Sequence, residues 1–122
     1  MAAGAYCEVH IADKALKVYR KAPAKDRARV ESIIGELATN GPDDLVDTQL
    51  KFEGRFPTGG KTGTKLAVWV VKSYQLRVYG GYWSKHPLVF LCPEVAIKKT
   101  NKADQELLRR VAKKVGEHHD DQ

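Results

Sequence analysis

The chain has 122 residues and a net charge of +6, from 21 lysines and arginines against 15 aspartates and glutamates. This length fits one domain, residues 1–122, whose core needs neither disulfides nor a structural metal, and the basic balance favours nucleic acid or an acidic protein as a partner. No apolar run approaches the ~20 residues that cross a bilayer, and Met1–Tyr6 lacks the features of a signal peptide, so a cytoplasmic protein without membrane attachment is expected.

The first forty residues predict a strand followed by a helical hairpin. Cys7–Ile11 alternates weakly, as a short strand does, and Asp13 is placed to cap a short helix after it. Pro23 can open the next helix, because a missing amide proton costs nothing at a helix start. Asn40–Pro42 ends this helix with a left-handed cap and a breaker. Its apolar stripe has helical spacing and consists of Val30, Ile33, Ile34, Leu37 and Ala38.

The second half predicts strands. Lys72-Ser73 is expected to be a turn, Gly80-Gly81 a bulge or bend, and Pro93 the end of the last strand. The four predicted strands are Leu50–Phe56, Leu66–Val71, Leu76–Trp83 and Leu88–Cys92.

The chain ends in a strong helical pattern over Gln105–Gly116, with Asn101 as the expected cap and Gly116 as the expected stop. The tail from about residue 117 is expected to fray. The predicted fold class is therefore α+β, with an antiparallel or mixed sheet of about four to five strands, an N-terminal helical hairpin and a C-terminal helix.

The stretch between Thr48 and Pro93 concentrates both charge and aromatic rings. It holds seven basic residues, a single acid, Glu53, and eight of the ten aromatics. Positive charge interleaved with flat rings suits a phosphate backbone with stackable bases, and RNA is the expected ligand. The alternative is an aromatic sheet core with a solubilising basic rim.

Several common site types are disfavoured by the same residues. The loop Gly59–Thr62 resembles a P-loop, but Arg55 stands where the first glycine is needed, and a strand follows instead of a helix. The histidines have no metal-ligand spacing, so no metal or cofactor is predicted. Cys7 and Cys92 lie in apolar segments and are expected to be buried, inert thiols, although their spacing leaves pairing open.

Paired carboxylates are missing from the basic half, which argues against a two-metal nuclease. Cleavage of RNA without a metal uses the 2′-hydroxyl as the nucleophile and needs cations for the phosphorane and groups that move protons. A lysine whose pKa is lowered by like charges, a tyrosine or a histidine can do so. The candidates are Lys72, Arg77, Tyr79, His86, Lys98 and Lys99.

The chain resembles the RelE/ParE toxin superfamily, especially its HigB-like, phage-derived branch. The most specific similarity is Ile97–Lys102, a strand end with a lysine–lysine–threonine run before a basic helix. Leu66–Lys72, Leu76–Tyr79 and Leu50–Gly54 are similar to the strands of that family. Pro93–Ala96 departs from it, because the family usually carries an aromatic there, so the proton-transfer residue is left open between His86 and a tyrosine.

The resemblance implies a toxin of a type II toxin–antitoxin pair that cleaves messenger RNA without a metal, on or off the ribosome. It also implies a small antitoxin, frequently a helix-turn-helix protein, that covers the basic face. Two alternatives stay open: a ParE-like toxin that acts on DNA gyrase without nuclease activity, and a non-toxic basic module that binds nucleic acid or the ribosome. The expected catalytic residues are Lys72, Arg77, Tyr79 and His86, and the expected RNA-binding residues are Lys51, Arg55, Lys85, Lys98 and Lys99.

Overall fold

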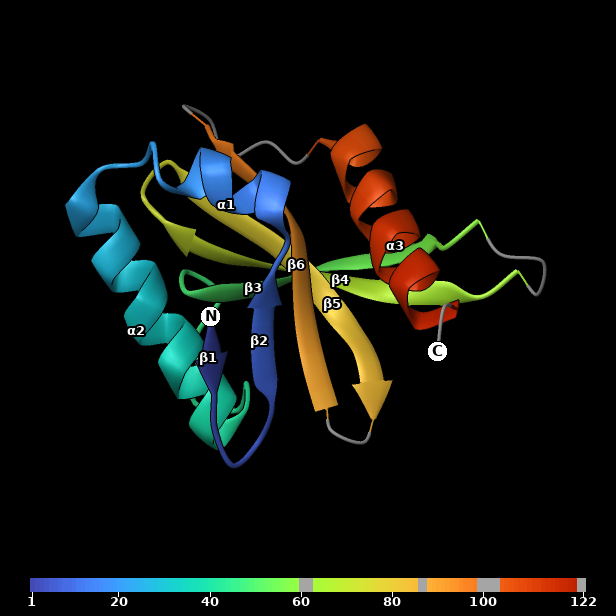
Figure 1. Ribbon diagram of the computed structural model, residues 1–122, viewed down its shortest axis with the longest axis horizontal. Coiled ribbons are helices and arrows are strands. Elements are labelled where there is room, and N and C mark those ends of the chain that lie inside the picture. The colour runs from blue at the N-terminus through green and yellow to red at the C-terminus, as the bar shows by residue number, and fades with distance from the viewer. Residues whose placement is uncertain (60–62, 86–87, 99–103, 121–122) are drawn as a thin grey trace.

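The computed structural model describes residues 1–59, 63–85, 88–98 and 104–120, without the side chains of residues 84, 85 and 118–120. These residues form three layers. Two N-terminal helices cover one face of a six-stranded sheet, and a C-terminal helix covers the other (Figure 1). The predicted α+β class is confirmed.

The N-terminal part confirms the predicted strand and helical hairpin. Its elements are β1 (Ala2–Ala3), β2 (Glu8–Ile11), α1 (Asp13–Tyr19) and α2 (Ala24–Asn40). Pro23 directly precedes α2, and Gly41 ends it with a φ of 83°, a left-handed value that glycine adopts without strain. Asp13 is not the cap of α1 but its first residue, because the helix already begins there after Ala12.

The C-terminal part contains all four predicted strands and the helix. Its elements are β3 (Leu50–Pro57), β4 (Lys65–Ser73), β5 (Leu76–Lys85), β6 (Leu88–Ile97) and α3 (Gln105–Asp120). The turn predicted at Lys72-Ser73 is wrong: both residues stay in the β4–β5 ladder, and Ser73 pairs with Leu76, so the turn consists of Tyr74 and Gln75.

β6 is longer than predicted, because Pro93 does not end it. The register between β5 and β6 shifts between Tyr79 and Gly81, and Pro93 lies opposite this irregularity. A residue without an amide proton is tolerated at such a bulge. The bulge predicted at Gly80-Gly81 is therefore confirmed. Gly80 also leaves no room for a side chain, because a Cβ there would lie 2.6 Å from the backbone oxygen of Leu91.

α3 begins at the predicted residue, Gln105, but its capping residue and its length differ from the prediction. Asp104 caps the helix, since its Oδ1 accepts hydrogen bonds from the backbone amides of Glu106 and Leu107 at 3.1 and 3.2 Å. The expected cap, Asn101, lies outside the described residues. Gly116 is not a stop, because α3 continues to Asp120.

Gly116 instead allows α3 to approach the sheet layer closely. A Cβ at this position would lie 2.5 Å from Cβ of Thr58, which follows β3 and is buried. A glycine in a helix interior is usually unfavourable by about 1 kcal/mol relative to alanine. Here the missing side chain is what permits the contact.

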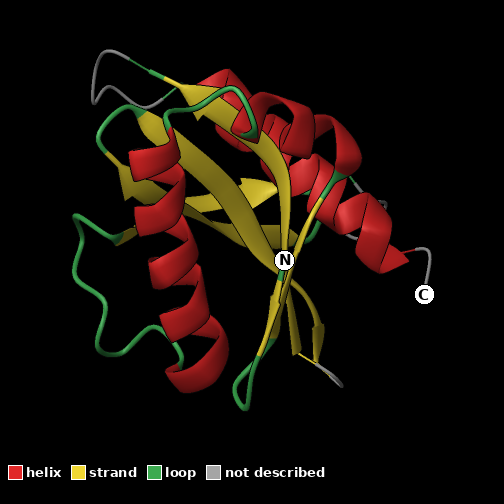
Figure 2. Ribbon diagram, turned by 60° about the vertical axis from the view of Figure 1, so that its left-hand side comes forward, coloured by secondary structure: helices red, strands yellow, loops and turns green. Residues whose placement is uncertain are grey.

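The sheet order is β1-β2-β6-β5-β4-β3, with β2 parallel to β6 and every other pair antiparallel. It has six strands instead of four to five, because the two-residue strand β1 is too short to leave a pattern in the sequence. α2 and α3 lie on opposite sides of this twisted sheet (Figure 2).

Alternate residues of the strands face the two helical layers. Val71 and Val78 are buried in the core beneath α1 and α2, whereas their neighbours Val70 and Tyr79 are buried beneath α3. This alternation decides on which face each basic side chain of the central strands lies. Most of the aromatics are partly or fully buried in these cores; Phe52 and Tyr74 are the exposed ones in the basic stretch.

Candidate functional site

Lys72 and Arg77 are direct partners across the β4–β5 ladder. Val70, two residues before Lys72, and Tyr79, two residues after Arg77, both belong to the core beneath α3. Strand alternation therefore places Lys72 and Arg77 on that same face, where the hairpin leaves the core and approaches its turn. The structure thus brings together two of the expected catalytic residues.

The surroundings of Lys72 disfavour its charged form. Partial burial lowers the pKa of its ammonium group, and repulsion from Lys51 and Arg77 lowers it further. The carboxylates of Glu53 and Asp47 oppose this effect without cancelling it. A lysine with a lowered pKa carries a larger neutral fraction near neutral pH, and the neutral amine is a base.

Lys51 and Glu53 extend the site onto β3. Lys51 pairs with Val70, which places it on the α3 face beside Lys72. Its Nζ lies 3.9 Å from Oε1 of Glu53, whose side chain is only 11% exposed. Glu53 is a residue that sequence reasoning missed, although it is the single acid of the basic stretch and thereby stands out there.

The side chain of Arg77 supports the hairpin turn. Its exposed fraction is only 7%, and Nη1 donates hydrogen bonds to the backbone oxygens of Leu76, at 3.1 Å, and of Tyr74. The guanidinium therefore has a structural function in addition to the positive charge that it places beside Lys72.

Tyr79 and Lys98 meet at the same end of the sheet. The Nζ of Lys98 lies 5.6 Å from the ring centroid of Tyr79, within the range of a cation–π interaction. Lys98 follows the end of β6, and its backbone amide donates a hydrogen bond of 2.7 Å to the backbone oxygen of Gln75 in the β4–β5 turn. The ring of Tyr79 is only 4% exposed, so it acts as a platform for Lys98 and is poorly placed to reach a substrate.

We call this group of residues the Lys72 site. It lies on the α3 face at the turn end of the β4–β5 hairpin, with basic residues from three strands and the segment after β6. It consists of Lys51, Glu53, Lys72, Arg77, Tyr79 and Lys98.

Arg55, which is predicted to bind RNA, does not belong to the Lys72 site. Residues four apart in a regular strand share a face, and this rule would group Arg55 with Lys51. A β-bulge at Glu53, between Phe52 and Gly54, adds one residue and reverses the alternation. Arg55 pairs with Ala67 and lies on the opposite face of the sheet.

Of the remaining predicted residues, Lys85 is not brought to the site. Lys85 ends β5, eight residues from Arg77, which is about 26 Å at a rise of ~3.3 Å per residue. His86 and Lys99 lie outside the described residues.

Two cations of α3, Arg110 and Lys114, are engaged by an acid on β6. Oε1 of Glu94 accepts hydrogen bonds from Nε of Arg110 at 2.5 Å and from Nζ of Lys114 at 2.9 Å. Burial alone would raise the pKa of Glu94, but these two bonds outweigh it and lower the pKa. Glu94 lies in the segment that departs from the family pattern, and its structural role is to fasten α3 to the sheet.

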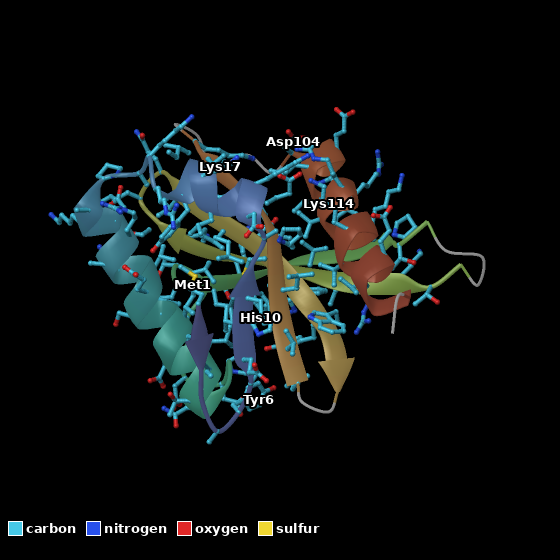
Figure 3. The ribbon with its side chains drawn as sticks, in the orientation of Figure 1. Met1, Tyr6, His10, Lys17, Asp104 and Lys114 are labelled. Carbon is cyan, nitrogen blue, oxygen red and sulfur yellow. The ribbon has the colours of Figure 1, made fainter. Side chains whose placement is uncertain are left out.

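A hollow of about 600 Å³ lies between the end of β2, the start of α1 and α3. Figure 3 shows His10 on β2 and Lys114 on α3, which both line it. Lys14 adds a further cation, and Asp13 and Glu117 add acids. This mixture of charges selects no single ligand class, and none of its lining residues belongs to the Lys72 site.

The thiols and the carboxylates of the described residues offer no other reactive centre. Cys7 and Cys92 are buried, as predicted, and they are unpaired. Burial raises the pKa of the Cys7 thiol, and it raises the pKa of the Cys92 thiol to about 12. Within the described ranges, no group of three or more histidine, cysteine, aspartate or glutamate side chains is arranged to hold a metal ion.

No family model, no curated protein and no solved structure matches this chain. A functional assignment therefore depends on the geometry of the Lys72 site and on the charge around it. Among the described helices, none combines the length and the apolar character needed to cross a membrane.

Proposed function

We propose that this chain is the toxin of a type II toxin–antitoxin pair and that it cleaves messenger RNA without a metal ion, on or off the ribosome. The observation that carries this proposal is the environment of Lys72, a half-buried lysine with a lowered pKa between Lys51 and Arg77. Such a cluster both attracts a phosphate and contains a group that can accept a proton.

In the proposed reaction, the neutral amine of Lys72 removes the proton from a ribose 2′-hydroxyl. The 2′-oxygen attacks the adjacent phosphorus, and the bond to the 5′-oxygen breaks. The products are a 2′,3′-cyclic phosphate and a 5′-hydroxyl, whose proton comes from a general acid. The cations of Lys51 and Arg77 stabilise the charge that develops on the phosphorane. Among the residues that the structure describes, Lys98 is the candidate for the general acid. Glu53 is a second candidate for the general base.

The test is the cleavage of a defined RNA by the purified chain in the presence of excess EDTA. We expect 2′,3′-cyclic phosphate and 5′-hydroxyl ends, detected by mass spectrometry of the fragments. A matched oligonucleotide with 2′-O-methyl groups lacks the nucleophile and should stay intact. Activity that requires a divalent ion, or cleavage of the 2′-O-methyl oligonucleotide, would contradict the proposed chemistry.

The toxin assignment has a separate test in cells. Expression of the chain alone should arrest growth, and coexpression of a small helix-turn-helix antitoxin from a neighbouring reading frame should restore it. An antitoxin that covers the Lys72 site would also block RNA cleavage by the purified protein. Normal growth on expression would contradict the toxin assignment.

The burial of Arg77 and Tyr79 favours a second candidate, a basic module that binds RNA or the ribosome without cleaving it. In that case the low exposure of both side chains reflects a purely structural role. Binding of the RNA in EDTA without any cleavage would favour this candidate over the nuclease.

A further inference from the structure

Tyr74 is the most exposed aromatic side chain among the described residues, at 64%. It lies in the two-residue turn of the β4–β5 hairpin and has a φ of 51°. This left-handed conformation is common for glycine and uncommon for a bulky residue. A large ring is therefore held in solvent at a position where local conformation favours glycine, and such outliers point to a function.

Two cations from α2 lie against the ring of Tyr74. The Nζ of Lys25 is 5.9 Å from the ring centroid, and Cζ of Arg29 is 5.3 Å from it. Lys25 and Arg29 are four residues apart on the helix and so share one face. Figure 1 shows the tip of the β4–β5 hairpin beside the first turns of α2. Both cationic side chains are exposed.

We infer that Tyr74, Lys25 and Arg29, here called the Tyr74 platform, form a second contact for single-stranded RNA, beyond the cleavage site. A base stacks on the ring of Tyr74, and the flanking phosphates meet the two cations. Stacking on an exposed aromatic with a positive charge beside it is a common way to hold a single strand without sequence preference. The choice of RNA as the ligand of the platform rests on the proposed function.

The platform is close enough to the Lys72 site for one strand of RNA to contact both. Tyr74 follows Lys72 by two residues, a rise of about 7 Å along the strand. Lys72 faces α3, whereas Lys25 and Arg29 belong to the layer on the opposite side of the sheet. The RNA would therefore pass around the tip of the hairpin, and the platform would hold a nucleotide next to the scissile phosphate.

An acidic peptide is the other macromolecule that two exposed cations could attract. It would use the charges of Lys25 and Arg29 but would have little use for an exposed ring. The exposed ring of Tyr74, held by a left-handed backbone conformation, is the unusual feature of the platform. It favours a ligand with flat faces, and RNA bases provide them.

The experiment measures the affinity of the full-length chain for a fluorescent 2′-O-methyl oligouridylate, which cannot be cleaved through its 2′-oxygen. Tyr74→Gly should weaken binding about tenfold, as expected for the loss of one stacked base. Its melting temperature should not fall, because glycine adopts the turn conformation freely. Tyr74→Phe keeps the ring and should bind like the wild type.

Charge is tested by the double substitution of Lys25→Ala and Arg29→Ala. The double variant should bind RNA more weakly. The slope of the logarithm of the binding constant against the logarithm of the salt concentration should become shallower by about 0.7 for each phosphate that is no longer neutralised. Lys17→Ala, which removes an exposed lysine of α1, is the matched control and should leave affinity unchanged. With 5-iodouridine in the oligonucleotide, ultraviolet light should cross-link the RNA to Tyr74.

Two outcomes would overturn the inference: unchanged RNA affinity for Tyr74→Gly with cross-links elsewhere, or displacement of the RNA by a polyglutamate peptide that binds Tyr74→Gly as tightly as wild type. The inference and the proposed function fail separately. If RNA binding depends on Tyr74 but unmodified RNA is not cleaved, the platform stands and the nuclease fails. If RNA is cleaved while Tyr74→Gly binds normally, only the platform fails.

Discussion

The guanidinium of Arg77 donates a hydrogen bond to the backbone oxygen of Tyr74. This contact joins the Lys72 site to the tip of the β4–β5 hairpin, because Arg77 is the direct cross-strand partner of Lys72. One buried arginine therefore supplies charge to the proposed cleavage site and also holds the turn that presents Tyr74 to solvent.

Arg77→Ala should reduce the stability of the fold as well as any activity. The substitution removes a charged donor from the backbone oxygens of Tyr74 and Leu76, and a hydrogen bond that involves a charged group contributes about 1.5–3 kcal/mol to stability after the competition with water is counted. We expect a loss of about 1–3 kcal/mol in the free energy of unfolding, measured by urea denaturation. Arg55→Ala, at an exposed position on the opposite face, should change stability little. Equal effects of the two substitutions would contradict the role of Arg77 in the turn.

Lys72→Met should stabilise the protein at neutral pH. The pKa of Lys72 is lowered in the folded protein by burial and by Lys51 and Arg77, so its protonated form carries a cost there that the unfolded chain does not have. This cost is fully present below the lowered pKa and disappears as the pH rises toward the ordinary value of 10.5.

The difference in stability between Lys72→Met and wild type should therefore narrow between the lowered pKa and pH 10.5. Thermal melts from pH 7 upward measure it. A difference in stability that widens as the pH rises would show that the positive charge of Lys72 stabilises the folded protein, which would contradict this prediction.

Glu94→Gln should weaken the attachment of α3 to the sheet. Its carboxylate accepts bonds from Arg110 and Lys114, and we expect a loss of about 1 kcal/mol at pH 7, because these partners are partly exposed and screened by solvent. The pKa of Glu94 is lowered in the folded protein, so this stability is present above the ordinary value of 4.5.

As the pH falls through the lowered pKa of Glu94, the carboxylate becomes protonated and the wild type should lose its advantage over Glu94→Gln. Urea denaturation of both proteins from pH 7 down to acid measures this. A difference that persists unchanged in acid would mean that the charge of Glu94 is not what holds α3.

Gly116→Ala and Gly35→Ala should have opposite effects, although both replace a glycine within a helix. A Cβ at position 116 would lie 2.5 Å from Cβ of Thr58, and overpacking of this kind typically costs about 1–3 kcal/mol. At position 35 nothing lies within 4 Å of the new Cβ, so the better helix propensity of alanine should add about 0.5–1 kcal/mol. Stabilisation by both substitutions would contradict the close packing of α3 against Thr58.

The predicted fold was recovered where local pattern and tertiary structure agree. The apolar stripe of α2 and the alternation of β5 each describe one element that buries one face. The predicted ends of elements are wrong where tertiary structure overrides a local sequence signal. Pro93 did not end β6, because the bulge at Gly80 removes the need for its amide proton. Gly116 lies within α3, where its missing side chain makes room for Thr58.

The predicted site was recovered only in part for a related reason. Lys72 and Arg77 lie at regular positions of neighbouring strands, so their proximity follows from the hairpin. The separation of Arg55 from Lys51 could not be predicted, because a bulge of one residue at Glu53 cannot be seen in an alternating pattern. Tyr74 was not predicted as a site residue, because the predicted turn lies two residues too early and the contacts of Tyr74 with α2 are distant in sequence.

The central claim is that the Lys72 site cleaves RNA without a metal, and the most direct measurement is the cleavage rate of three variants in excess EDTA. Lys72→Ala should lower the rate by at least ~100-fold, the usual contribution of a proton-transfer group. Lys72→Arg keeps the charge but cannot become neutral, so it should be similarly impaired. Lys65→Ala, at the exposed far end of β4, should cleave like the wild type. Equal rates for Lys72→Ala and Lys65→Ala would contradict the claim.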